Sequence, residues 1–228
     1  MGDLDFDVIA RTWPYLLSGL RYTIQLTVVA AIGGIIFGTL LAMARLSHFK
    51  PLALAAAAYV NLMRSVPLLL VIFWFYFLVP VAIQVITGAE YPILMGADRS
   101  AYITFIMFEA AYFCEIVRAG IQSIPKGQVN AASALGLNYR QTMQYIVLPQ
   151  AFRNMLPVLL TQTIILFQDV SLVSLLNVTD FVGAAVKVAQ RDSRIVEMYA
   201  FVAVVYFLMC FALSTLARRL QKRIAIIR

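Results

Sequence analysis

The sequence predicts an all-α membrane protein that crosses the bilayer five times. Apolar residues make up 62% of the 228 residues and charged residues only 13%, whereas a soluble domain has roughly 25% charged residues. The mean hydropathy is +0.86. Five apolar runs also have about the length of 20 residues that a helix needs to span a bilayer. Length and composition together exclude an ordinary soluble domain.

The predicted spans are Tyr22–Ala44, Ser65–Ala89, Ser100–Val117, Asn154–Val178 and Met198–Ala217. A further apolar run, Pro51–Met63, is too short to cross and is expected to lie on the surface or to pack at the membrane boundary. We therefore expect an outer N-terminal segment at residues 1–19 and a transmembrane domain at residues 20–217. That domain includes a long connecting loop at residues 119–152, and a basic tail follows at residues 218–228.

Lysines and arginines are divided unevenly between the two sides of this topology. Twelve of the eighteen lie between spans one and two, between spans three and four, and after span five. The other side holds six, balanced by eight acidic residues. The positive-inside rule places the N-terminus outside and the C-terminus in the cytoplasm. The N-terminal segment begins with Asp3, Asp5 and Asp7, which is not the basic start of a signal peptide, so we expect it to remain in the mature protein.

Prolines and glycines within the spans predict a packed bundle. Pro67 and Pro80 bracket span two, and Pro157 lies early in span four. Each frees a backbone carbonyl that neighbouring helices must satisfy, which indicates burial in a bundle. The glycines of span one allow close helix approach; they are Gly33, Gly34 and Gly38. The aromatic run at residues 73–77 covers all faces of its helix, which favours packing and an interfacial belt over a substrate cage.

The sequence lacks the residue sets that catalysis requires. It has no phosphate-binding G-x-x-x-x-G-K-[ST] motif, and its single histidine, His48, lies in a loop without nucleophile or carboxylate partners. Cys114 and Cys210 lie in apolar spans and lack metal-ligand spacing. We expect no catalytic residue, no metal site, no cofactor bound by this chain and no nucleic-acid partner. Uphill transport would therefore draw its energy from an ion gradient or from another subunit.

Acidic residues in the third span are costly at membrane depth and normally pair or line a substrate route. Glu115 has Arg118 one helical turn away, a spacing that favours an ion pair, although route lining is the alternative. Glu109 has no partner within its own helix. It is expected either to accept an interhelical hydrogen bond or to line a pathway.

The fourth span carries a polar face. Gln162 and Asp169 are seven residues apart and therefore lie on one side of a helix, and Gln168 and Ser171 widen the patch. At about 1.5 Å per residue from Asn154, Asp169 lies roughly 22 Å along the helix, in the outer half of the membrane. Its carboxylate is suited to an ammonium group, and pairing with another helix is the alternative. The candidate substrate-pathway residues are Gln162, Gln168, Asp169, Ser171 and Glu109.

The stretch NAASALGLNYRQTMQYIVLP, residues 130–149, is polar between two apolar spans. Pro125 suits the first turn of a short helix that ends at Gly136, with Leu137 folding back. Asn138 and Gln141 form the pattern of a capping box for a second helix, which Pro149 is expected to stop. The result is a compact projection with an apolar face, formed by Leu135, Leu137, Tyr139, Met143 and Ile146. Helix connections are usually two to eight residues, so the length of this one favours a partner surface.

The spacing of this stretch resembles the cytoplasmic E-A-A-x3-G-x9-I-x-L-P loop of binding-protein-dependent ABC import permeases. Asn130-Ala131-Ala132, Gly136 and the closing residues 146–149 match it, with asparagine where the family has glutamate. YLLSGLRYTIQLTV, NLMRSVPLLLVIFWFY, FEAAYFCEIVRAGIQSIPKGQ and LFQDVSLVSLL also resemble the polar amino acid subfamily, so the likeness covers nearly the whole chain. The chain is most similar to bacterial glutamate/aspartate import permeases.

This resemblance implies the type I importer fold in the bacterial inner membrane. It implies a second permease subunit (a copy or a sister), a cytoplasmic ATPase dimer that hydrolyses ATP, and a periplasmic amino-acid-binding protein. The implied ATPase-coupling residues are Asn130, Ala131, Ala132, Gly136, Leu137 and Arg140. Asparagine at position 130 removes the charge available for a salt bridge to the ATPase, but it can still form hydrogen bonds. The implied cargo is a polar amino acid such as glutamate or aspartate.

Two other classes of function compete with this one. An ion-coupled secondary carrier would be favoured by inverted repeats and more spans, and neither is visible in the sequence. A membrane scaffold that transports nothing would not require Gln162, Asp169 and Glu109 at depth.

Overall fold

The computed structural model describes residues 5–91 and 95–224, and within these ranges the chain forms helices and no strand. Asp3 and Arg228, part of the predicted end segments, lie outside them. The helices are α1 Asp7–Arg45, α2 Lys50–Ser65, α3 Leu68–Phe73, α4 Val79–Thr87, α5 Ala97–Gln122, α6 Lys126–Ala134, α7 Tyr139–Gln141, α8 Leu148–Asp169, α9 Phe181–Asp192 and α10 Ile195–Ile224. Three further turns continue them: π-helical η1 Trp74–Leu78, π-helical η2 Thr142–Val147 and 3₁₀-helical η3 Val170–Leu176.

The five predicted spans are confirmed. In the described ranges, five helical stretches are long and apolar enough to cross a membrane: Asp7–Arg45, Leu68–Thr87, Ala97–Gln122, Tyr139–Leu176 and Ile195–Lys222. The first helix begins at Asp7 rather than near Tyr22, so most of the predicted outer segment is helical. Its 39 residues extend about 58 Å, well beyond a hydrocarbon core of about 30 Å.

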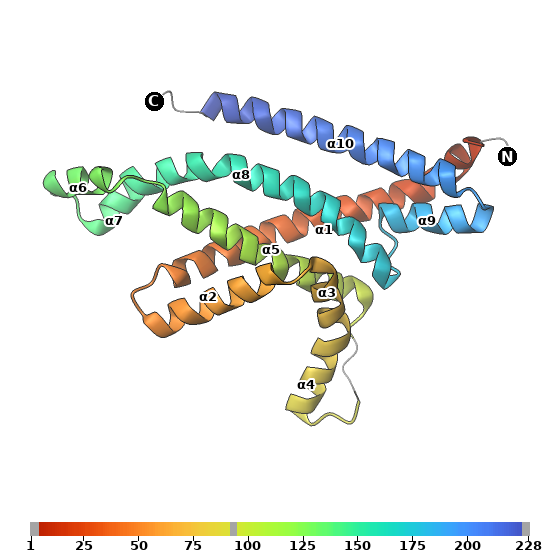
Figure 1. Cartoon of the computed structure of the whole chain (residues 1–228), viewed down its shortest axis with the longest axis horizontal. Coiled ribbons are helices and arrows are strands. Elements are labelled where there is room, and N and C mark those ends of the chain that lie inside the picture. The colour runs from red at the N-terminus through yellow and green to blue at the C-terminus, as the bar shows by residue number, and fades with distance from the viewer. Residues whose placement is uncertain (1–4, 92–94, 225–228) are drawn as a thin grey trace.

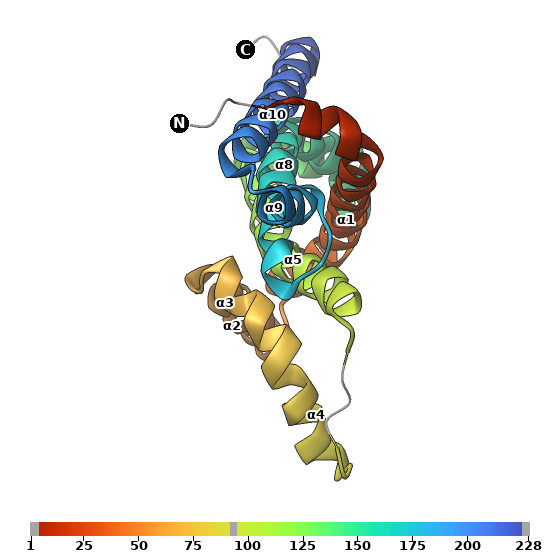
Figure 2. The same ribbon diagram turned by 90° about the vertical axis from the view of Figure 1, so that its right-hand side faces the viewer.

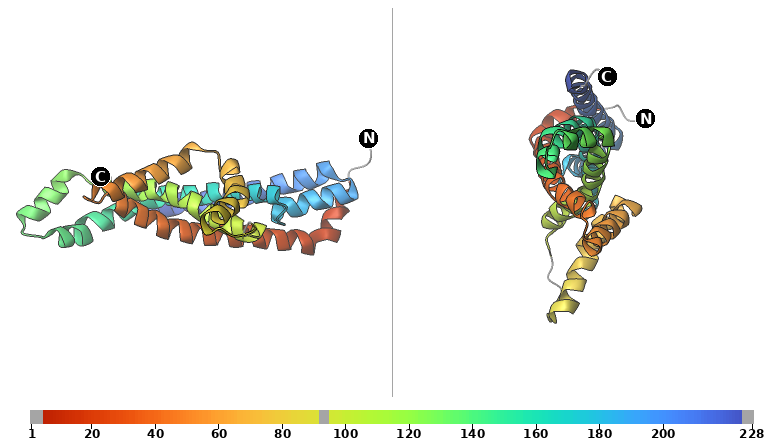
Figure 3. Two further views of the ribbon diagram at one scale, coloured as in Figure 1. Left: turned by 90° about the horizontal axis from the view of Figure 1, so that it is seen from below. Right: turned by 90° about the vertical axis from the view of Figure 1, so that its left-hand side faces the viewer.

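The long helices lie along one axis of the molecule. Figures 1 and 3 show α1, α5, α8 and α10 running lengthwise, while α3 and α4 project away from them. The N-terminus and α9 lie at one end, and α6 and α7 lie at the other (Figure 1). Figure 2 shows how far α4 extends from the remaining helices. The α6–α7 segment and the C-terminal end of α10 therefore lie at the same end of the molecule. Alternating spans require this, because the two segments follow the third and the fifth span.

Two prolines follow π-helical turns. Pro80 lies in the first turn of α4 after η1, and Pro149 lies in the first turn of α8 after η2. Our prediction that Pro149 stops a helix is wrong. The π-turn shifts the local bonding, so that Leu148 donates its backbone N–H to the carbonyl of Met143. This local widening accommodates a residue that lacks an N–H and whose ring crowds the preceding turn.

Sequence reasoning missed helix α9. Asp180 begins it, and its carboxylate accepts hydrogen bonds from the backbone N–H groups of Val182 at 3.1 Å and Gly183 at 2.9 Å. An acidic residue at this position satisfies donors that a helix start leaves free. The buried face of α9 packs against the N-terminal half of α1 and the start of α10, where Leu16 and Met198 are buried.

Glycines bring α1 into close contact with α5, as the sequence predicted. A Cβ added at Gly34 would lie 2.9 Å from Cβ of Glu109, and one at Gly38 would lie 2.8 Å from the carbonyl oxygen of Ala110. A Cβ at Gly33 would lie 3.0 Å from Ile106. A Cβ essentially never fits at the distances found for Gly34 and Gly38, so the close approach of the two helices depends on these two glycines, whereas at Gly33 the Ile106 side chain would have to shift.

We expect Gly38→Ala to lower the thermal midpoint of the purified protein by on the order of 5 °C, because overpacking costs about 1–3 kcal/mol. The added methyl group meets backbone atoms of α5, which cannot move aside as a side chain end can. Gly96→Ala is the control, since a Cβ there meets open space. Equal midpoints for the two variants would contradict the close-contact interpretation.

Burial raises the pKa of Asp180 from its ordinary 3.8 to about 6, although the N–H groups of Gly183 and Val182 oppose this shift. The folded state therefore holds this proton more tightly than the unfolded state, and stability falls as pH rises from about 4 to about 6. Asp180→Asn keeps an accepting oxygen but does not titrate. We expect the difference in thermal midpoint between wild type and this variant to change across that window and to be constant above pH 7. Parallel curves from pH 4 to 7 would contradict this.

Candidate functional site

Helices α6 and α7 form a compact projection with a defined turn. Gly136 adopts a left-handed conformation with φ 80°. Its backbone N–H donates a hydrogen bond to the carbonyl oxygen of Ser133 at 3.0 Å. The backbone N–H of Leu137 donates to the carbonyl oxygen of Ala132 at 3.1 Å. This pair of bonds is the Schellman motif, which ends a helix at a glycine. Pro125 lies one residue before α6 rather than within its first turn.

A capping box begins the second half of the projection. The backbone N–H of Gln141 donates to the Asn138 side chain, and the backbone N–H of Asn138 donates to the Gln141 side chain, both at 2.9 Å. The predicted box is therefore confirmed. From Tyr139 the chain stays helical through η2 into α8, so the projection is joined to the fourth span without a loop.

The predicted coupling residues lie on this projection. Five of the six are exposed or partly exposed, and Ala132 is buried. Of the expected apolar face, Leu135 is 81% exposed and Tyr139 is 78% exposed. Leu137, Met143 and Ile146 are partly buried. The tip of the projection thus carries large apolar side chains that nothing in the described part of the chain covers.

The structure brings Glu109 and Gln162 together. Glu109 is fully buried, and the Gln162 Nε2 donates to its two carboxylate oxygens at 3.1 and 3.4 Å. Of the two alternatives for Glu109, the interhelical hydrogen bond is therefore present. Asp169 lies within electrostatic range of Glu109. Its half-buried carboxylate has no hydrogen-bond or ion-pair partner in residues 5–91 and 95–224.

The other two predicted pathway residues do not join this pair. Gln168 is exposed, and its amide donates to the sulfur of Cys210 on α10 at 3.4 Å. Ser171 lies in η3, where its backbone carbonyl accepts a hydrogen bond from Ser174. The polar face of the fourth span is therefore divided, with Gln162 turned toward α5 and Gln168 toward α10.

Glu115 forms the predicted ion pair with Arg118, at 2.6 Å, and also contacts two arginines that sequence reasoning missed. Arg45 at the end of α1 donates to Glu115, and Arg64 near the end of α2 lies 3.9 Å from it. No sequence signal joined these residues, because α1, α2 and α5 meet only in the folded chain. The carboxylate ties the ends of three helices together.

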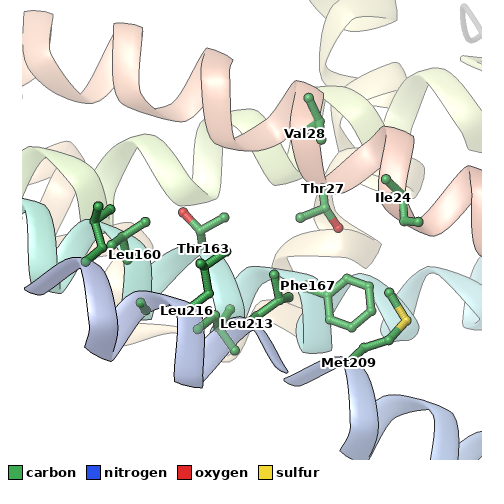
Figure 4. A pocket seen from close by; sticks show the side chains of 12 residues that line it. Ile24, Thr27, Val28, Leu160, Thr163, Phe167, Met209, Leu213 and Leu216 are labelled. Carbon is green, nitrogen blue, oxygen red and sulfur yellow. The ribbon is translucent and has the colours of Figure 1, made fainter. Parts of the chain in front are cut away.

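A cavity of about 390 Å³ lies between α1, α8 and α10, and Figure 4 shows its lining. Leucine, isoleucine, phenylalanine and methionine side chains dominate it, with two threonines, Thr27 and Thr163. A polar amino acid would lose its hydration there without compensation. The cavity is therefore suited to hydrocarbon and is not the polar site.

Comparison with known proteins decides the family. Residues 34–226 match the family described as the binding-protein-dependent transport system inner membrane component. The chain belongs to this family.

Relatives of this permease match it over nearly their full length. It is 48% identical to the glutamate/aspartate import permease protein GltK of Escherichia coli O6:H1, covering 99% of this chain and 100% of the relative. It is 33% identical to the L-cystine transport system permease protein TcyB of Bacillus subtilis, covering 97% and 92%.

Two solved structures share the fold. A crystal structure of an amino acid ABC transporter with histidines matches with a TM-score of 0.88 and 29% identity, covering 97% of this chain and 100% of the other. An inward-facing MetNI methionine ABC transporter matches with a TM-score of 0.74 and 18% identity, which shows the fold alone.

Membership of this family settles the class of function. The protein is a permease subunit of a binding-protein-dependent importer and a multi-pass protein of the inner membrane. It is a transport subunit rather than an enzyme in its own right. The comparisons support neither an ion-coupled carrier nor a scaffold that transports nothing.

We expect Gln162→Leu to lower the free energy of unfolding by about 1–3 kcal/mol, because it leaves the buried Glu109 without its hydrogen-bond donor. Glu109→Leu combined with Gln162→Leu removes both partners and should recover part of the loss. Thermal unfolding in one detergent compares the four proteins of this cycle. Additive losses in the double variant would show that the two side chains do not interact.

Proposed function

We propose that this permease subunit imports glutamate or aspartate in an ATP-driven complex. The observation that carries the proposal is the end-to-end likeness to the glutamate/aspartate permease GltK, at 48% identity. The crystal structure of an amino acid ABC transporter that matches with a TM-score of 0.88 supports amino acids as the cargo.

In the complex, two permease subunits enclose the route, as a homodimer or with a sister permease. A cytoplasmic ATPase dimer binds and hydrolyses ATP with Mg²⁺, and this chain binds no cofactor itself. A periplasmic binding protein delivers the amino acid. The N-terminus lies outside and the C-terminus inside, with the α6–α7 projection in the cytoplasm. The uneven distribution of lysine and arginine supports this orientation.

The projection docks each permease subunit onto one ATPase subunit. Its exposed Leu135 and Tyr139 supply apolar contact area, and Arg140 lies beside them. Asn130 and Ala131 are exposed on the same element, and the buried Ala132 lies on α6, which packs against η2. An asparagine at position 130 contacts the ATPase through hydrogen bonds in place of an ion pair.

The polar face between α5 and α8 forms the amino-acid route. Asp169 supports this assignment, because a half-buried carboxylate without a partner is suited to the α-ammonium group that every amino acid carries. Glu109 and Gln162 lie beside it. Gln168 faces α10 and Ser171 lies in η3, so we assign these two residues to the outer margin of the route rather than to the face between α5 and α8.

Reconstitution tests the function. The permease is placed in proteoliposomes with its cognate ATPase and binding protein, and uptake of labelled glutamate, aspartate, glutamine and cystine is measured. We expect ATP-dependent uptake of the two acidic amino acids. ATP-dependent uptake restricted to the other two would overturn the assignment of the cargo.

We expect Gly136→Val to reduce the stimulation of ATP hydrolysis by the liganded binding protein about tenfold or more. A β-branched residue is an outlier at a φ of 80°, so the turn that shapes the projection is lost. Gly127→Val is the matched control, because Gly127 lies on the same projection with ordinary φ and open space around it. Undiminished stimulation of ATP hydrolysis in the Gly136→Val variant would contradict the assignment of the projection as the docking site.

A further inference from the structure

The charged cluster around Glu115, in the C-terminal part of α5, contains more cations than anions. Three arginines surround the single carboxylate of Glu115. Arg45 bonds one oxygen of this carboxylate, and Arg118 bonds the other through Nε at 3.2 Å and Nη2 at 2.6 Å. One negative charge against three positive charges leaves the cluster with a net charge of +2.

Of the three arginines, Arg64 is the one whose N–H groups remain available to bind a ligand. Its guanidinium lies 3.9 Å from Glu115 and makes no hydrogen bond recorded in the described part of the chain. Its side chain is 42% exposed, compared with 16% for Arg45 and 28% for Arg118. A guanidinium presents five N–H donors in a planar fork that matches a carboxylate. The Glu115 cluster therefore keeps one arginine with its donors open.

The ring of Tyr112 holds Arg64 in place. The guanidinium carbon lies 5.4 Å from the ring centroid, within the range of a cation–π contact. Tyr112 is three residues from Glu109, so the two share one face of α5. Both Glu109 and Asp169 lie within electrostatic range of the Tyr112 hydroxyl. Arg64 is thus fixed beside the polar face rather than free in solvent.

The route between α5 and α8 has two poles as a result. The half-buried carboxylate of Asp169, which has no partner in the described residues, forms an anionic pole, and Arg64 over the Tyr112 ring forms a cationic pole. An amino acid carries an ammonium group and at least one carboxylate, and an acidic amino acid carries two. Arg64 and Asp169, which both lie within electrostatic range of Tyr112, thus offer opposite charges to the two kinds of charged group in such a molecule.

We propose that Arg64 binds a carboxylate of the amino acid while the acidic pole holds its ammonium group. This inference rests on the proposed function, since it concerns the same route. It supplies the cation that an acidic cargo requires and that Glu109, Gln162 and Asp169 lack. Arg45 and Arg118 supply the hydrogen bonds to Glu115, so that Arg64, at 3.9 Å from this carboxylate, keeps its N–H donors open.

Transport measurements on Arg64→Gln test the inference. With the ATPase and binding protein in proteoliposomes, we expect glutamate uptake per ATP hydrolysed to fall about tenfold or more, because a charge-assisted hydrogen bond is lost. Stimulation of ATP hydrolysis by the binding protein should persist. Arg64→Lys keeps the charge without the planar fork and should lie between wild type and the glutamine variant. Arg219→Gln, an exposed arginine of α10, is the control for a change of charge.

A second measurement observes binding directly. Saturation-transfer NMR on the purified permease–ATPase complex, without binding protein, detects glutamate, glutamine and γ-aminobutyrate. Loss of the glutamate and glutamine signals in Arg64→Gln assigns Arg64 to the α-carboxylate, and loss for glutamate and γ-aminobutyrate assigns it to the side-chain carboxylate. Either pattern supports the proposal.

Two results would overturn it. The first is unchanged uptake per ATP and unchanged ligand signals in Arg64→Gln. The second is a parallel loss of uptake and ATP hydrolysis in both Arg64 variants, which marks a purely structural residue. Failure of the proposed function is distinguishable, because the wild-type complex would then take up neither glutamate nor aspartate.

Discussion

The contact between α1 and α5 is the packing interaction on which the polar features of this permease depend. Gly34 and Gly38 present no side chain, so the helices approach until an added Cβ at Gly34 would lie 2.9 Å from Cβ of Glu109. At this separation Glu109 is fully buried, and the donor that reaches it is Gln162 of α8. The same register brings Arg45 at the end of α1 against Glu115. Small residues achieve this in a membrane, where helices gain little from excluding water and associate through close van der Waals contact.

Two prolines within membrane spans are each accommodated by a π-helical turn. In span two and in span four, a π-helical turn comes immediately before a helix whose first turn contains the proline, Pro80 or Pro149. A π-turn inserts one residue into the helical repeat and changes which carbonyl each N–H contacts. The chain therefore keeps its direction where an α-helix would break or kink. Pro157 lies within α8 itself, where the hydroxyl of Thr161 bonds its carbonyl at 3.1 Å.

The sequence predicts most of the helices and few of the contacts between them. Five spans are evident from apolar length, and the capping box at Asn138 is evident because its partners are three residues apart. Helix α9 is too short to be detected from hydropathy. The helix end predicted at Pro149 is absent because a π-helical turn accommodates the proline. The contacts of Glu115 with Arg45 and Arg64 could not be predicted from the sequence for a different reason. Arg45 is 70 residues away in the chain, and only the packing of α1 against α5 brings the two together. Gln168, in contrast, is six residues from Gln162 and therefore about a third of a turn away around the helix, so its different neighbour follows from spacing alone.

The continuity of the chain from Tyr139 to Leu176 has a mechanical consequence. These 38 residues form a rod about 57 Å long, with the apolar tip at one end and the unpaired Asp169 near the other. No loop within it can absorb displacement. A displacement of the tip is therefore passed along the helix toward Asp169, because the whole stretch is helical. One helical rod therefore joins the exposed tip of the projection to a carboxylate within the membrane that has no partner among the described residues.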